Sequence, residues 1–97
     1  MNDGDASLDL LFRMLSDPTR RAILHSLGGG EKTIGELVAP YRMTFAAASK
    51  HIKILEQAGL ATRRIVGAKH LVRASPDALL PIRTWIERYL AVAAAVR

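Results

Sequence analysis

Five side chains would lie on one face of a predicted helix and could together bind a nucleic acid. At 100° per residue, a helix sets Ala46, Ser49, Lys50, Lys53 and Gln57 in a stripe about 100° wide. The short side chains of Ala46 and Ser49 let a helix backbone approach base edges in the roughly 12 Å major groove of duplex DNA. We expect Lys50 to reach a base edge and Lys53 a phosphate, so the stripe predicts DNA recognition.

The start of the same segment has the features of a helix N-terminus. Thr44 can cap a helix that runs to residue 58 and stops at a glycine. Free backbone N–H groups and the positive dipole at such an end favour a phosphate, with the Thr44 hydroxyl beside them. Phe45 comes next, and its ring is expected either to pack inward with Ala48, Ile52 and Leu55 or to touch a thymine methyl group.

The positive charge of the chain is concentrated around this helix. The 97 residues carry 14 Lys and Arg against 9 Asp and Glu, a net charge of +5. Residues 42–73 hold seven basic residues and one acidic residue, Glu56, for a net charge of +6, while the rest of the chain sums to −1. This distribution is typical of a surface that faces a polyanion, although charge alone fits a solvated face equally well. The residues expected at a DNA surface are Arg42, Thr44, Phe45, Ala46, Ser49, Lys50, His51, Lys53, Arg63, Arg64 and Lys69.

Two β-prone runs follow the helix and predict a two-stranded hairpin. Residues 60–66 and 70–74 are rich in aliphatic side chains and flank a turn at Gly67. Within the hairpin, Arg63, Arg64 and Lys69 are expected to contact flanking phosphates or the minor groove.

Three further helices are expected ahead of these elements. Residues 7–15 carry apolar side chains at helical spacing, and Asp17 followed by proline is typical of a helix start. Thr33 and Glu36 match a capping box, which predicts a short helix beginning at residue 34.

The C-terminal segment predicts a helix with an apolar seam. A proline at position 81 favours a short turn through residue 80 and a main helix after it. Apolar residues then recur at alternating spacings of three and four, which is typical of helix–helix packing. The seam indicates a homodimer interface, with packing onto the chain's own core as the alternative, and a small-molecule pocket in the seam is left open. The residues expected at the interface are Leu8, Leu11, Phe12, Ile82, Trp85, Ile86, Tyr89 and Ala93.

In this order the elements predict a winged helix-turn-helix, a mainly α fold with a small β-hairpin. We expect one DNA-binding domain over residues 1–97. The helix-turn-helix would occupy about 33–58 and the wing about 60–74, with dimerisation helices at about 7–15 and 77–96.

Two stretches of the sequence resemble a known family. LSDPTRRAIL at 15–24 and TFAAASKHIKILEQAGL at 44–60, followed by the charged hairpin, resemble the ArsR/SmtB-type winged-helix repressors. The resemblance covers about residues 8–89. It implies a homodimer with two recognition helices in successive major grooves of a palindromic operator, and repression relieved by an inducer, either a small molecule or a protein. It also implies DNA contacts at Phe45, Ala46, Ser49 and Lys50, although family members often have Gln or another polar residue at the first of these positions.

The residues that metal sensors of this family use are missing from the sequence. The known sites use a Cys-x-Cys pair before the turn or His, Asp and Glu side chains along the last helix. This chain has no cysteine, and residues 81–97 hold one carboxylate, Glu87, which cannot supply the three or four ligands of a zinc site. His25, His51 and His70 are expected to pack or to touch phosphates, so we expect a member without metal or other cofactor.

Two other classes of function compete with DNA binding. A winged helix can serve as a protein-interaction module, but such a module has no need to concentrate positive charge on one helix and wing. An enzyme is disfavoured because the sequence has no cysteine nucleophile, phosphate-binding loop, paired carboxylates or Ser/His/Asp set. The N-terminal residues do not form a signal peptide and no apolar run approaches the roughly 20 residues of a membrane span, so a cytoplasmic, nucleoid-associated prokaryotic protein is expected.

Overall fold

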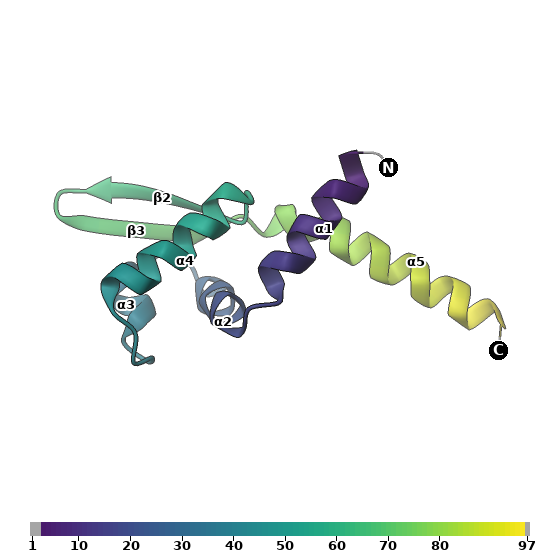
Figure 1. Cartoon of the computed structure of the whole chain (residues 1–97), viewed down its shortest axis with the longest axis horizontal. Coiled ribbons are helices and arrows are strands. Elements are labelled where there is room, and N and C mark those ends of the chain that lie inside the picture. The colour runs from purple at the N-terminus through teal and green to yellow at the C-terminus, as the bar shows by residue number, and fades with distance from the viewer. Residues whose placement is uncertain (1–2, 97) are drawn as a thin grey trace.

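Helices α1 (Asp3–Leu15) and α5 (Leu80–Val96) lie side by side towards one end of the molecule (Figure 1). The hairpin of β2 (Ala61–Val66) and β3 (Lys69–Ala74) projects from the other end. The computed structural model describes residues 3–96, with side chains from residue 7 onward, and measures 54 × 27 × 20 Å. It confirms the winged helix-turn-helix. The elements are α1 (Asp3–Leu15), α2 (Pro18–Leu27), β1 (Lys32–Thr33), α3 (Ile34–Val38), α4 (Phe45–Gln57), β2 (Ala61–Val66), β3 (Lys69–Ala74), the 3₁₀ turn η1 (Pro76–Leu79) and α5 (Leu80–Val96).

The start of α2 follows the predicted cap. Asp17 Oδ1 accepts hydrogen bonds from the backbone N–H groups of Thr19 and Arg20 at 2.7 and 3.1 Å, and Pro18 occupies the first turn. The pKa of Asp17 lies below its ordinary value, and the hydrogen bond from the Arg20 amide is the largest cause. Arg20 also donates to the carbonyl of Met14 at 2.8 Å, which ties the beginning of α2 to the end of α1.

The capping box at α3 is present as predicted, but the residue before the helix also belongs to a strand. Thr33 Oγ1 accepts from the Glu36 amide at 3.1 Å, and Glu36 Oε1 accepts from the Thr33 amide at 3.0 Å. Thr33 at the same time pairs with Leu71 of β3. The sheet therefore has three strands in the order β1-β3-β2, and the expectation of two strands was incomplete because β1 is only two residues long.

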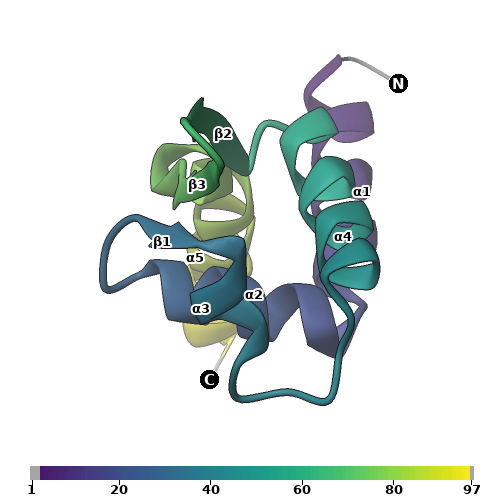
Figure 2. The same cartoon turned by 90° about the vertical axis from the view of Figure 1, so that its left-hand side faces the viewer.

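Helix α4 lies against the sheet, as the end-on view of Figure 2 shows. Ala48, Ile52 and Leu55 are fully buried, and Gly59 at φ +77° ends the helix in the left-handed conformation that glycine adopts without strain. Phe45 does not join the buried face: half of its side chain (52%) is exposed, because the first turn of α4 extends past the core. The expectation that it packs inward is corrected by this position.

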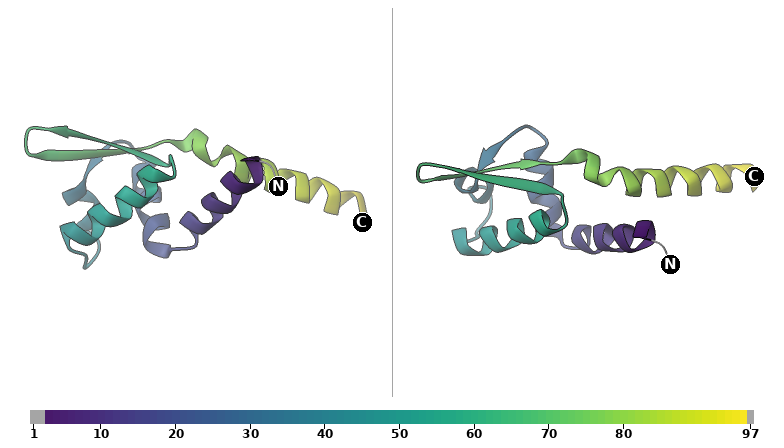
Figure 3. Two further views of the ribbon diagram at one scale, coloured as in Figure 1. Left: turned by 45° about the horizontal axis from the view of Figure 1, so that its top comes forward. Right: turned by 90° about the horizontal axis from the view of Figure 1, so that it is seen from above.

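The hairpin and α5 follow one another almost in a line when the molecule is seen from above (Figure 3). Helix α5 begins at Leu80, one residue earlier than the proline suggested, directly after η1. Its first half packs on α1, where the rings of Phe12 and Trp85 meet edge to face at 5.9 Å, and Trp85 stacks on Tyr89 at 5.9 Å.

Two residues expected in the dimer seam lie in the core of the protomer itself. Leu11 and Ile82 are buried to 5% and 9% exposure between α1 and α5. Phe12, Trp85 and Tyr89, which were expected in the same seam, are exposed. None of the described helices is long and apolar enough to cross a lipid bilayer.

Candidate DNA-binding surface

The two sides of α4 differ in the way the sequence predicts. Opposite the buried side, Ala46, Lys50 and Lys53 are exposed, while Ser49 is half-buried. Thr44 Oγ1 accepts from the Ala47 amide at 3.1 Å and so fixes where the helix begins. The side chains on the exposed side of α4 are small near the start of the helix and basic one turn later, which suits a close approach to a polyanion.

Arg63 of β2 lies against α4 and connects the wing to it. Its Nη1 donates to Ser49 Oγ at 3.0 Å and its Nη2 to the Ser49 carbonyl at 3.2 Å. Its Nε donates to Glu56 Oε1 at 3.0 Å, and its Nη2 lies 2.9 Å from the same carboxylate oxygen in an ion pair. Only 16% of the Arg63 side chain is exposed, so Arg63 departs from the expectation that all three basic residues of the wing reach phosphates.

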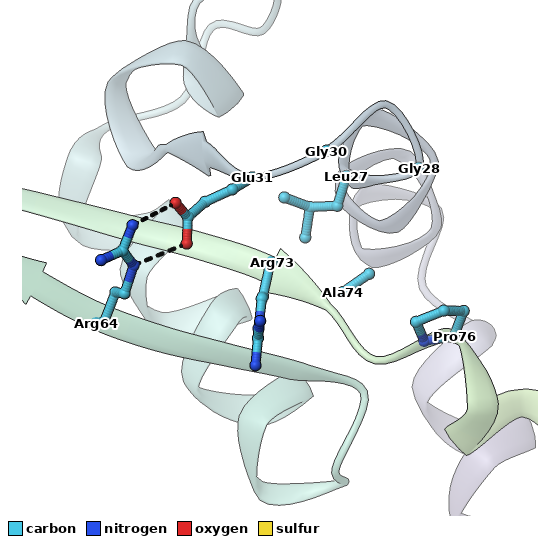
Figure 4. Close-up of a pocket in the computed structure, with 8 residues that line it drawn as sticks. All are labelled: Leu27, Gly28, Gly30, Glu31, Arg64, Arg73, Ala74 and Pro76. Carbon is cyan, nitrogen blue, oxygen red and sulfur yellow. Dashed lines mark hydrogen bonds and ion pairs between the residues drawn. The ribbon is translucent and has the colours of Figure 1, made fainter.

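Arg64 points to the opposite face of the hairpin and pairs with Glu31 in the loop before β1 (Figure 4). The guanidinium and carboxylate form two bonds of 2.8 and 3.0 Å, which lower the pKa of Glu31 and raise that of Arg64. The pair borders an open hollow of about 550 Å³ between the end of α2 and the sheet. With 63% of its side chain exposed, Arg64 remains accessible to a phosphate.

The other predicted cations are exposed and carry unneutralised charge. Arg42, Lys50, Lys53 and Lys69 form no ion pair with any residue in the part of the chain that the structure describes. They extend from the turn before α4, along α4, to the tip of the wing. Strand alternation places Arg64 and Lys69 on the face of the sheet opposite Arg63, so the basic side chains of the segment are distributed over α4 and both faces of the wing, the elements at the left of Figure 1.

Two histidines near this surface are partly enclosed. His70 packs edge to face on Phe45 at 5.8 Å and so links the wing to the start of α4. His51 is half-buried on α4 and lies close enough to Asp17 to contribute to the lowering of its pKa. Its Nδ1 is buried and has no hydrogen-bond partner among the described residues.

Comparisons with known proteins agree with this geometry. A family model described as a helix-turn-helix domain matches residues 15–64. The HTH-type transcriptional regulator Rv2034 of Mycobacterium tuberculosis is 34% identical over 83 residues, which cover 86% of this chain and 78% of Rv2034. The structure of an ArsR-like transcriptional regulator from Rhodococcus sp. RHA1 is 30% identical with a TM-score of 0.82, covering 98% of this chain and 88% of that one. The chain belongs to the ArsR family of winged helix-turn-helix transcriptional regulators.

Two further proteins are similar to this ArsR-family chain. The transcriptional repressor SdpR of Bacillus subtilis is 42% identical over 48 residues, half of this chain and 53% of SdpR. A homodimeric winged helix-turn-helix DNA-binding domain from Mycobacterium bovis shares the fold with a TM-score of 0.70 at 21% identity, covering 95% of this chain and 91% of that one. As a member of the ArsR family, this chain is a DNA-binding transcriptional regulator and not an enzyme.

The ArsR family includes metal sensors, so the ligands available here are relevant. Within the described part of the chain, no three His, Asp or Glu side chains come close enough together to hold a metal ion. Glu87, the carboxylate in the last helix, instead accepts a 2.8 Å hydrogen bond from Arg83.

Sequence reasoning missed three features of the surface. Arg73 lies on the same face of the sheet as Arg64 and donates to Thr62 Oγ1 at 3.2 Å, a placement that strand alternation could have revealed. Ile65 and Val66 expose 64% and 50% of their side chains, which makes the tip of the wing apolar between its basic flanks. The ion-pair partners of Arg63 and Arg64 were not predictable, because no local pattern pairs residues from different elements.

Proposed function

We propose that this ArsR-family chain is a sequence-specific repressor that binds a palindromic operator as a homodimer and acts without a metal ion. The observation that supports the proposal best is the set of exposed cations on the turn before α4, on α4 and on the wing. Small side chains at the start of α4 are followed by two lysines, and further cations stand at Arg42 and Lys69. None of these four side chains forms an ion pair with the residues that the structure describes.

The chemistry of the side chains suggests a division of roles on DNA. Ser49 and Lys50, one turn into α4, would hydrogen-bond to base edges in the major groove. Lys53, Thr44 and the free amides at the start of α4 would hold phosphates. Arg42, Arg64 and Lys69 would contact the backbone on either side, whereas Arg63 is excluded from this set because its guanidinium is bonded to α4.

The apolar surface of α1 and α5 supports the homodimer. Phe12, Trp85, Ile86 and Tyr89 all expose more than two fifths of their side chains, and α5 continues past α1 to the C-terminus (Figure 1). A contiguous exposed patch of this kind marks a protein interface, and a second copy is the partner we assign to it. The Mycobacterium bovis domain of the same fold is homodimeric.

A two-fold dimer would present two copies of α4 to one face of DNA. Half-sites then lie about one helical turn apart and repeat with inverted symmetry, so the operator is expected to be palindromic. Repression follows if this operator overlaps a promoter, and the similar protein SdpR is a transcriptional repressor. We further propose that the dimer acts in the cytoplasm.

The experiment that tests the proposal is selection of bound duplexes from a randomised pool, followed by affinity measurements at several salt concentrations. We expect an inverted-repeat consensus, and an affinity for it that falls by about 0.9 log units per phosphate contact for each log unit of salt. A chain that shows no preference among duplexes, or an affinity independent of salt, would contradict the proposal. That result would favour a protein-interaction module, the competing use of this fold.

A further inference from the structure

The contact between Arg63 and Ser49 bears on how the chain chooses among bases. We propose that Arg63 is a positioning residue that makes Ser49 a hydrogen-bond donor towards DNA, so that Ser49 selects a base with an acceptor in the major groove. The inference rests on the proposed function, since it assigns a base preference to one side chain of the DNA-binding surface.

The hydroxyl chemistry of Ser49 carries the first step. A hydroxyl group has one proton to donate and can accept through its oxygen. In the structure the Ser49 oxygen accepts from the charged guanidinium of Arg63 at 3.0 Å, while its proton is donated to no group in the described part of the chain. The bond from the charged guanidinium occupies one of the two lone pairs of the Ser49 oxygen. It polarises the hydroxyl, which strengthens the O–H as a donor and weakens the oxygen as an acceptor of a second hydrogen bond.

The anchoring of Arg63 carries the second step. Glu56 and Ser49 lie seven residues apart on α4, which is two helical turns, so they flank the guanidinium along one side of the helix. The bond from Nη2 to the Ser49 carbonyl fixes the plane of the guanidinium against the backbone as well. Because Arg63 is held at three points and is mostly buried, it stays beside Ser49 whether or not DNA is bound.

Because Ser49 acts as a hydrogen-bond donor, it can bond only to a base that offers an acceptor in the major groove. Adenine and guanine offer N7 in the major groove, guanine also offers O6, and thymine offers O4, whereas cytosine offers only its N4 amino group, which is a donor. We therefore expect cytosine to be disfavoured on the strand that Ser49 faces, by about five- to ten-fold in affinity, the effect of one hydrogen bond.

The experiment compares base preferences of variants on the consensus selected by the unmodified chain. Each operator position is changed in turn to the other three bases, and affinities are measured for the unmodified chain, Ser49→Ala and Arg63→Lys. Lysine keeps the positive charge of Arg63 but lacks the planar guanidinium that donates to Ser49 and Glu56 at the same time. Arg64→Lys is the matched control, since Arg64 is the neighbouring wing arginine and bonds to Glu31 instead.

We expect one position in each half-site at which the unmodified chain rejects cytosine. Ser49→Ala and Arg63→Lys should both lose the rejection at that position while they keep preferences elsewhere. Arg64→Lys should keep it. Retained rejection in Arg63→Lys, no position sensitive to Ser49→Ala, or a preference for cytosine at the sensitive position would overturn the inference with the proposed function intact. Failure of the unmodified chain to select any consensus would refute the proposed function as well.

Discussion

Arg64 and Glu31 are 33 positions apart in the sequence, yet their side chains meet in a forked ion pair with bonds of 2.8 and 3.0 Å. The carboxylate thus neutralises one of the basic side chains of the wing in the absence of DNA. A phosphate that approaches Arg64 would have to share the guanidinium with Glu31 or displace it, so we expect Glu31 to reduce the attraction of the wing for DNA.

Removal of this carboxylate charge should strengthen DNA binding. Glu31→Gln is expected to raise the affinity for random and operator duplexes alike by about two- to five-fold, the magnitude of an exposed ion pair. It should also steepen the salt dependence by about 0.9 if Arg64 gains a phosphate. Fluorescence anisotropy at several salt concentrations measures both. Glu87→Gln, which breaks the ion pair with Arg83 on α5, is the matched control and should change neither; unchanged or weaker binding by Glu31→Gln would contradict the prediction.

The two exposed lysines of α4 should respond differently to truncation. Lys50→Ala is expected to cost about 1–3 kcal/mol of operator binding and to relax the preference at one base step, because a base-edge contact is lost. Lys53→Ala should weaken all duplexes to a similar extent and reduce the salt slope by about one phosphate. The two variants remove the same charge from the same helix, so each controls for the other. Equal effects of Lys50→Ala on operator and random duplex would show that Lys50 contacts no base.

The apolar surface of α5 should be required for self-association. Ile86→Glu combined with Tyr89→Glu introduces charges that a partner copy would have to bury, and we expect monomers in analytical ultracentrifugation and weakened operator binding. The matched control is Thr84→Glu combined with Ala91→Glu, which adds the same charges to exposed positions on the other side of α5 and should leave the dimer intact. A dimer that survives the first pair of changes would show that the interface lies elsewhere.

The cap of α2 should contribute measurably to stability, and its contribution should depend on pH. Asp17→Ala removes the acceptor for the amides of Thr19 and Arg20 and is expected to cost about 1 kcal/mol in the free energy of unfolding at pH 7. The pKa of Asp17 is lower in the folded chain than in the unfolded one, so its stabilisation is present above the unfolded value and disappears as the pH falls through the folded value. Urea unfolding at pH 7 and near pH 3, at one protein concentration, should show a smaller difference between the variants at the lower pH.

Metal ions should not weaken binding to the operator. We expect zinc, cadmium and arsenite to change operator affinity by less than about two-fold, because the sequence has no cysteine and a zinc site needs three or four ligands. The measurement is a titration of each ion into the protein–operator complex after treatment with a chelator. A ten-fold loss of affinity with any of them would contradict the metal-independent function.

Features set by neighbouring residues were predictable from the sequence, and features set by distant pairs were not. Asp17, Thr33 and Thr44 cap the helices they were expected to cap, because a cap depends on a few consecutive residues. The basic segment was correctly found by counting charges, but counting cannot tell a free cation from a paired one such as Arg63. The sequence left open whether the Phe45 ring packs inward, because its place in the helical stripe is apolar while the core beneath it has already ended.

The pairing partner of Thr33 has a consequence for how the domain comes apart. Thr33 is at once the cap of α3 and the residue of β1 that pairs with Leu71 of the wing. An opening of the sheet at β3 therefore also loosens the cap and exposes the amide of Glu36 to solvent. We therefore expect the wing and the helix-turn-helix to exchange their protected amide protons as one cooperative unit, and a helix-turn-helix cut away from its wing would lack the strand next to the cap of α3.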